Sequence, residues 1–416
     1  MGNRRGYGRL WGNRNFATIL ASQAAGDIGQ GLSSVVLTWY VLEQGGPAML
    51  GILISGRCLP YLLFSALAGV AADRIDRRRA MIVADGLTAL VALLFPILAG
   101  AGLLGAWPAV ALGFAFDTLR EFSSVARRSL VPRVVPRDAY VAAVSLNSVT
   151  FRLGNTVGAG LVGLLSRAFG LINLYALIGA CMAVAAVAVS TMRAPREVTA
   201  GPGELARARA AAQPNLVRAV AADLVQGFRA ALKNPFLRTV FTLDGLYFTF
   251  AHGPLMVGLP MLIKSLGGDA GTLGFVQAAG SGMSLLVVIL AGQYLNVARY
   301  GPTLVGGWLG FALAIFAVGF STSPGMAAIA YSVQQSCGFL VPLSSQVIIQ
   351  NKVPPDELGK AFGVWDTIAP GFGVVSAALA GIAARTVPVA VLFCVGGAVS
   401  LTATLIARLS VVWREG

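Results

Sequence analysis

Apolar residues occur along this chain in long runs, and polar residues are confined to the gaps between them. A helix needs about 20 predominantly apolar residues to cross a bilayer, and twelve runs reach that length. They begin near Phe16, Ala48, Ala80, Trp107, Ala139, Phe169, Phe236, Thr272, Pro302, Pro324, Leu358 and Thr386. The pattern predicts an all-α membrane protein with twelve transmembrane helices.

One polar gap is much longer than the others, and it divides the runs into six and six. We expect a six-helix bundle over residues 1–192, a linker over residues 193–235 and a second six-helix bundle over residues 236–416. The linker has an amphipathic pattern, which predicts either a helix on the membrane surface or a simple linker helix. Its apolar positions recur every four residues, at Leu216, Val220, Leu224 and Phe228.

The second half of the chain repeats the first. VPRDAYVAAVS, which begins at Val135, resembles VPPDELGKAFG, which begins at Val353, at an offset of 218 positions. Gly163 matches Gly381 at the same offset. Parallel repeats of six helices are typical of transporters whose substrate site lies between the repeats near the middle of the membrane. We therefore expect the two bundles to be pseudo-symmetric.

The composition argues against a soluble protein. Charged residues make up 12% of the chain and hydrophobic residues 56%, whereas about 25% of the residues of a soluble protein are charged. The basic N-terminal stretch leads into a long apolar run, which predicts a first transmembrane helix rather than a cleaved signal peptide.

Basic residues are distributed very unevenly between the two sets of connections. Of the 31 Lys and Arg residues, 25 fall in the N-terminal, C-terminal and connecting segments of one side, and three fall on the other side. Because Lys and Arg stay on the cytoplasmic side, we expect a cell-membrane protein with both termini in the cytoplasm. Contact with anionic lipid then explains the net charge of +14 without a nucleic-acid partner.

The sequence offers little material for catalysis or metal binding. It has one histidine and lacks a phosphate-binding loop and a catalytic triad. Its four cysteines are far apart within apolar runs, which is typical of packing residues: Cys58, Cys181, Cys337 and Cys394. We expect no metal, no cofactor and no enzymatic activity.

A dense charged motif follows the second apolar run. Its residues are Gly69, Asp73, Arg74, Arg77, Arg78 and Arg79. The motif resembles the signature loop of the major facilitator superfamily, and the resemblance extends over the whole chain. The Gly26-Asp27 pair in the first run is similar to the branch that contains macrolide efflux proteins and the enterobactin exporter. A weaker copy of the loop, without the acidic residue, spans Ala291 to Gly301.

The resemblance implies a conformational latch in this loop. An acidic residue at the carboxyl end of a helix is unfavourable alone, so Asp73 needs a positive partner. The family resemblance implies that this Asp locks the outward-facing state, with Gly69, Arg74 and Arg77 as parts of the switch. The alternative is a purely topogenic basic loop, which fits Arg78 well.

Several ionisable residues fall inside the apolar runs, where an unpaired charge costs several kcal/mol. Asp27 and Glu121 are the leading candidates for a carboxylate that exchanges protons near an arginine. The fourth run carries Asp117, Arg120 and Glu121 at i, i+3 and i+4, so this face could form its own ion pair or direct Arg120 toward Asp27. Arg152 is a second candidate partner of Asp27. Static pairing that only positions the helices is the alternative for these acids.

The seventh run carries Asp244 and His252, eight residues apart and therefore on one helix face. The imidazole of His252 titrates near neutral pH, so it is either a proton carrier or a polar group that satisfies backbone freed by Pro254. Aromatic residues nearby in the chain are candidates to line a site for a bulky amphipathic substrate: Tyr247, Phe248, Phe250, Trp365 and Phe372.

The fifth run contains Gly154 and Gly158, followed by Ala159 where antiporters of the superfamily usually have proline. Small residues there permit close helix packing, while Ala159 weakens the inference of antiport. In the eleventh run, Pro370 and Gly371 form a plausible bend point for rocking.

Together these features favour a secondary active transporter. The leading hypothesis is a proton-coupled exporter of a drug-like compound or secondary metabolite, such as an antibiotic or siderophore, that works by alternating access as a monomer. Import of a small solute, and a non-transporting membrane receptor or scaffold, are the alternatives. The residues do not distinguish proton from sodium coupling.

Overall fold

The computed structural model describes Leu10 and residues 12–71, 76–136, 139–192, 235–294, 300–353 and 358–408. The regular elements within these residues are helices. Asp73, Arg74 and the predicted amphipathic helix of the linker lie outside the described residues, as does part of the weaker loop copy.

Packing divides the chain into two compact units. The first comprises Met1–Tyr40 and Pro60–Leu216, and the second comprises Val41–Leu59 and Val217–Gly416. Val41–Leu59, which precedes the linker in the chain, thus packs with the second unit. The bundle boundaries 1–192, 193–235 and 236–416 stay a prediction.

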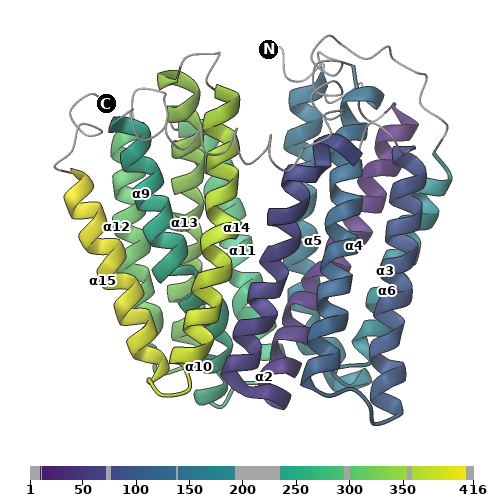
Figure 1. Ribbon diagram of the computed structural model, residues 1–416, viewed down its shortest axis with the longest axis horizontal. Helices are drawn as coiled ribbons and strands as arrows, with labels where there is room; N and C mark the ends of the chain where they lie inside the picture. Colours follow the sequence, from purple (N-terminus) through teal and green to yellow (C-terminus); the bar gives the residue numbers. More distant parts are fainter. Residues whose placement is uncertain are drawn as a thin grey trace. The chain divides into compact units, whose positions relative to one another are not determined.

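The first unit is built from helices of the N-terminal half (Figure 1). A core of apolar side chains from five helices closes one end of it, with Phe16, Met81, Leu130, Ala143 and Val189 among its buried members. The helices are α2 (Arg14–Ala71, shared with the second unit), α3 (Arg77–Gly100), α4 (Ala106–Val134), α5 (Tyr140–Phe169) and α6 (Leu174–Ser190). α3 packs against both α4 and α6.

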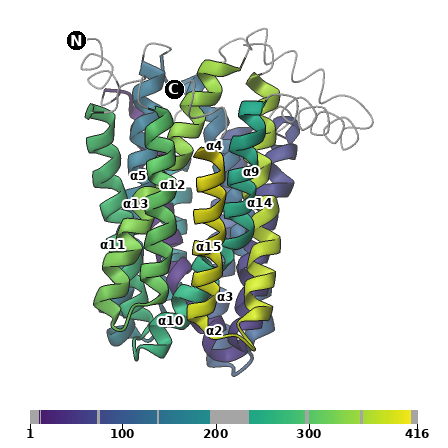
Figure 2. The same ribbon diagram turned by 90° about the vertical axis from the view of Figure 1, so that its left-hand side faces the viewer.

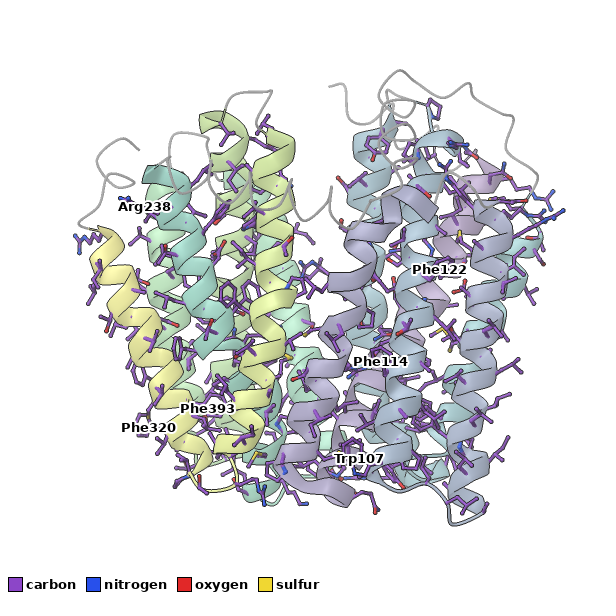
Figure 3. All side chains as sticks on the ribbon, viewed as in Figure 1. Trp107, Phe114, Phe122, Arg238, Phe320 and Phe393 are labelled. Atoms are coloured by element: carbon purple, nitrogen blue, oxygen red, sulfur yellow. The ribbon has the colours of Figure 1, made fainter. Side chains whose placement is uncertain are left out.

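In the second unit α15 lies beside both α9 and α12 (Figure 2). Figure 3 shows Arg238 at the end of this unit where α9 begins, and Phe320 and Phe393 toward the opposite end. The elements are α9 (Pro235–Phe250), π-helix η2 (Pro254–Gly258), α10 (Leu259–Ser265), α11 (Ala270–Tyr294), α12 (Tyr300–Gly319), α13 (Pro324–Lys352), α14 (Leu358–Ala383) and α15 (Val389–Arg408).

The predicted runs and the observed helices start within a few residues of one another, but the number twelve stays a prediction. The first two runs correspond to two helical stretches, labelled together as α2, that meet at a kink at Gly46, where the backbone is non-helical with a φ of 70°. η2 interrupts the seventh run. Within the described residues, five helices are long and apolar enough to cross a membrane. α4 is not among them, because six charged residues interrupt it.

The exposed faces of the helices are apolar, and their buried faces carry polar as well as apolar side chains. On α3 the exposed face carries Leu90 and Ile97, whereas the buried face includes Asp85 and Thr88. On α4 the exposed Trp107 and Phe114 lie two turns apart, as Figure 3 shows. Exposed apolar stripes, with polar groups confined to the interior, suit a protein whose solvent is lipid.

Glycine brings two pairs of helices into backbone contact. A Cβ on Gly158 of α5 would overlap the Ile28 carbonyl oxygen and lie 2.8 Å from the Leu32 nitrogen of α2. In the second unit, a Cβ on Gly253 would overlap the backbone of Ser376 on α14. The predicted close packing by the small residues of the fifth run is therefore confirmed.

The α2–α5 contact predicts a specific destabilisation. In Gly158→Ala the new methyl group meets backbone that cannot yield, so the variant should lose about 1–3 kcal/mol of stability. The thermal unfolding midpoint of the purified protein in detergent measures this. Gly86→Ala on α3 is the control, because a Cβ there meets nothing within 4 Å and alanine favours the helix. Equal midpoints for the two variants would contradict the contact.

Candidate proton-coupling and substrate site

Asp27 forms a buried ion pair with Arg120. The side chain of Asp27 on α2 is 3% exposed, and its Oδ1 accepts a hydrogen bond of 3.1 Å from Arg120 Nη2 on α4. A Cβ on Gly26 would lie 2.5 Å from Arg120 Nη1, so the glycine leaves room for the guanidinium. Gly154 of α5 covers the other side, because a Cβ there would lie 2.6 Å from the Cβ of Asp27. Of the two predicted arrangements of Arg120, the one directed toward Asp27 is observed.

The other two acids on this face of α4 have different partners. Asp117 Oδ1 accepts a hydrogen bond of 3.1 Å from the amide of Gln30 on α2. Glu121 pairs with Arg128, two turns further along α4. Arg152 is partly exposed on α5, and the ion pair of Asp27 is made with Arg120 rather than with it.

A second buried ion pair was missed by the sequence analysis. Asp85 on α3 is fully buried, and Arg127 Nη2 on α4 lies 3.8 Å from its Oδ2. Arg127 lies near the end of the fourth run, and α4 continues to Val134 and buries it. Arg127 follows Arg120 by two helical turns, and that spacing was the signal that could have revealed it.

In the second unit Asp244 has a neutral partner. Its carboxylate is 4% exposed and accepts a hydrogen bond of 2.7 Å from Trp365 Nε1. Within the described part of the chain this is its only hydrogen bond. Aromatic rings surround the neighbouring Tyr247, whose centroid lies 4.8 Å from that of Phe311 and 5.4 Å from that of Trp308. Of the five predicted aromatic residues, Tyr247 and Phe248 belong to this cluster, and Trp365 packs near Phe362 instead. Phe250 and Phe372 are exposed, and an aromatic substrate site stays a prediction.

His252 and Asp244 contact different residues. Its ring packs at 5.5 Å from Phe248, and it precedes the π-helix that begins at Pro254. The backbone N–H of Gly253 donates to Ser376 Oγ. Among the described residues, no cluster of three or more His, Cys, Asp or Glu side chains could hold a metal ion.

The described part of the charged loop is held firmly at the start of α3. Asp76 caps the helix by accepting from the backbone N–H groups of Arg78 and Arg79, a role that the sequence analysis missed. Arg77 is buried. Arg78 donates to the carbonyl oxygens of Val189, at 3.3 Å, and Ser190 at the end of α6, where a cation is favourable. Arg78 thus has a structural contact beyond topology.

A family model described as transmembrane secretion effector matches residues 11–415. The chain belongs to this family of the major facilitator superfamily. Members of the superfamily are multi-pass transporters of small molecules in the plasma membrane, and they are not enzymes.

Characterised members of the superfamily resemble this chain over most of its length. It is 27% identical to the multidrug efflux pump Tap of Mycolicibacterium fortuitum, over 87% of each chain. It is 22% identical to macrolide efflux protein A of Streptococcus pyogenes, over 85% of each chain.

Solved structures of the superfamily share the fold. The nucleoside transporter NupG superposes with a TM-score of 0.73 at 13% identity, over 96% of this chain and 99% of that one. The xylose transporter XylE from E. coli gives 0.68 at 13% identity, over 96% and 95%. The all-helical major facilitator fold is therefore confirmed.

The Asp27–Arg120 pair predicts a non-additive effect on stability. Arg120→Met leaves a buried carboxylate without its cation and should cost about 3–5 kcal/mol. The double variant Asp27→Asn with Arg120→Gln removes both charges and should recover most of that loss in the thermal unfolding midpoint. Arg79→Ala is the control, because its ion pair with Asp76 is exposed and contributes less than about 1 kcal/mol. Additive losses in the double variant would contradict the pairing.

Proposed function

We propose that this protein exports a drug-like compound or secondary metabolite, such as an antibiotic or siderophore, in exchange for protons, by alternating access. The observation that carries the proposal is the buried carboxylate of Asp27 beside Arg120. A static scaffold has no use for the cost of burying such charges. An acid whose neighbours differ between two states takes up a proton in one and releases it in the other.

The geometry of Asp27 supports a specific site for the proton. Oδ1 accepts the hydrogen bond from Arg120, whereas Oδ2 is buried and has no hydrogen-bond partner among the described residues. Oδ2 is the atom that takes the proton. Protonation removes the charge that Arg120 neutralises, so the ion pair weakens and Arg120 can move. Asp117, Glu121 and Arg152 adjust the local charge as it does so.

The proposed direction of transport is inferred from the proteins that this chain resembles. Tap and macrolide efflux protein A are named as efflux pumps, and this chain aligns with most of both. Solved structures of sugar and peptide transporters share only its fold, at under 25% identity, so they do not favour import. The second unit supplies the substrate-facing groups. They are the carboxylate of Asp244 with its partner Trp365, the aromatic cluster around Tyr247, and His252, which packs against that cluster.

The proposal includes the topology of the chain. Twelve crossings form bundles over residues 1–192 and 236–416, and both termini are cytoplasmic. α2 supplies two of the crossings, and the α9–η2–α10 segment supplies the seventh. Gly69, Asp73, Arg74, Arg77 and Arg78 form the cytoplasmic latch loop.

A contact inside the second unit supports alternating access. Gly51 of α2 meets Gly381 of α14, since a Cβ on Gly51 would lie 2.8 Å from the Gly381 Cα. Ser55 donates a hydrogen bond of 2.8 Å to the Val374 carbonyl oxygen alongside it. The contact contains few side-chain atoms, so it can separate and re-form during the cycle without repacking.

The test of coupling is Asp27→Asn in proteoliposomes with an imposed proton gradient. The wild-type protein should move radiolabelled erythromycin against its concentration gradient. Asp27→Asn should lose this uphill transport and retain erythromycin exchange, because only the proton site is removed. Asp269→Asn, at an exposed helix cap, is the matched control and should keep both. If the variant still transports uphill, Asp27 is not the coupling acid. If a folded wild-type protein moves no drug-like or siderophore probe, the exporter proposal fails.

The Gly51–Gly381 contact predicts a different loss. Gly381→Leu prevents the contact from forming, and an overpacking cost of about 1–3 kcal/mol lowers the population of that state by roughly tenfold or more. Uphill transport and exchange should therefore fall together by about that factor. Gly363→Ala on the same helix meets nothing within 4 Å and should transport normally. Normal exchange in Gly381→Leu would show that the contact plays no part in the cycle.

A further inference from the structure

Asp85 is among the most completely buried charged side chains of the first unit. Its exposed fraction is 0%, and neither carboxylate oxygen has a hydrogen-bond donor among the described residues. Within the described residues, the cation at ion-pair distance is Arg127, with 3.8 Å between Nη2 and Oδ2. A carboxylate this deep is retained only with a compensating charge, so its ionised state depends on Arg127.

Arg127 is placed to act on two carboxylates. It is 7% exposed, its Nη2 donates weakly to Ser123 Oγ at 3.5 Å, and its Nε has no partner among the described residues. Asp85 and Asp27 both attract it electrostatically, while Arg120 and Arg128 on its own helix repel it. Its side chain is thus held loosely between an acid of α3 and an acid of α2.

The acids and arginines of this group are paired. Asp27 and Asp85 oppose Arg120 and Arg127, and the pair Glu121–Arg128 is neutral by itself. Asp117 on α4 accepts a hydrogen bond from the amide of Gln30. Among the other packed helices, α6 has no charged residue. α5 covers Asp27 with Gly154 and carries Arg152 and, in its last turn, Arg167. Removing the charge of Asp85 leaves Arg127 without its paired carboxylate, and Asp27 is the other carboxylate that attracts it.

We propose that Asp85 is a positioning residue for the proton site: it holds Arg127 away from Asp27 and so sets how readily Asp27 binds a proton. This rests on the proposed proton exchange at Asp27. With Asp85 in place, Asp27 has one close cation, Arg120, and a proton can displace that single interaction. Without Asp85, Arg127 approaches Asp27 as a second cation, and the proton must compete with both.

The experiment is an infrared titration of carboxyl protonation in the purified full-length protein, with the Asp27 band identified by its loss in Asp27→Asn. In Asp85→Asn the Asp27 midpoint should move to lower pH by about one unit, a tenfold change in proton affinity. Asp85→Glu should restore the wild-type midpoint, and Asp269→Asn should not move it.

The double variant Asp85→Asn with Arg127→Gln separates positioning from a general structural effect. If Asp85 acts through Arg127, the double variant should titrate at a higher pH than the wild type, because Asp27 has lost the attraction of Arg127. It also keeps the proposal testable if Asp85→Asn alone fails to fold, because it buries no unpaired charge. An unchanged Asp27 midpoint in Asp85→Asn, or a double variant that titrates at or below the wild-type midpoint, would overturn the proposal.

The same variants distinguish this inference from the proposed function. The infrared titration needs neither a substrate nor a gradient. If Asp85→Asn moves the Asp27 midpoint but the wild-type protein transports no probe, the exporter proposal fails and the positioning role stands. If the wild type performs proton-driven erythromycin efflux and the pH profile of Asp85→Asn is unchanged, the positioning role fails alone.

Discussion

A charged group inside an apolar helix bundle needs an opposite charge or a hydrogen-bond donor beside it. The helices of this protein are arranged so that their buried charges have such partners. α4 carries three arginines that reach acids of α2, α3 and α4 itself. Moving any of these helices by a turn would leave a buried charge unpaired, at a cost of several kcal/mol. The ion pairs therefore define the register of three helices in a unit whose apolar contacts alone would tolerate sliding. Asp244 in the second unit obeys the same constraint with an indole donor, which stabilises its carboxylate less strongly than a cation would.

Much of the fold could be predicted because each membrane helix requires a long run of apolar residues, which is easily recognised in the sequence. The starts of the apolar runs agree with the helices, since each helix in lipid must satisfy its own backbone. The pattern of apolar residues did not predict the geometry of the connections between helical stretches. Two helical stretches of α2 meet at a kink at Gly46, and a π-helix begins at Pro254, next to the N–H of Gly253 that donates to Ser376 Oγ on α14. The second of these connections involves a residue that is distant in the sequence.

The site was predictable to the extent that charge stood out against an apolar background. Asp27 and Arg120 could be paired from their positions in two runs. Asp85 and Arg127 were less evident, because each lies near the end of a run, where a charged residue usually faces the interface, and only the two-turn spacing of Arg127 from Arg120 indicated a buried position. The two halves of the chain differ in the partners of their buried acids. Asp27 pairs with an arginine. Asp244, which lies near the corresponding position of the second half, accepts a hydrogen bond from Trp365 instead.

The guanidinium of Arg78 joins two places that are far apart in the chain. It sits at the first turn of α3, directly after the charged loop, and it holds the last carbonyl groups of α6, just before the chain enters the linker. The helix that follows the loop and the helix that precedes the linker are therefore joined by the same side chain. A pull on the chain beyond α6 is transmitted through two hydrogen bonds to the start of α3. Arg78 therefore couples the position of the start of α3 directly to that of the end of α6.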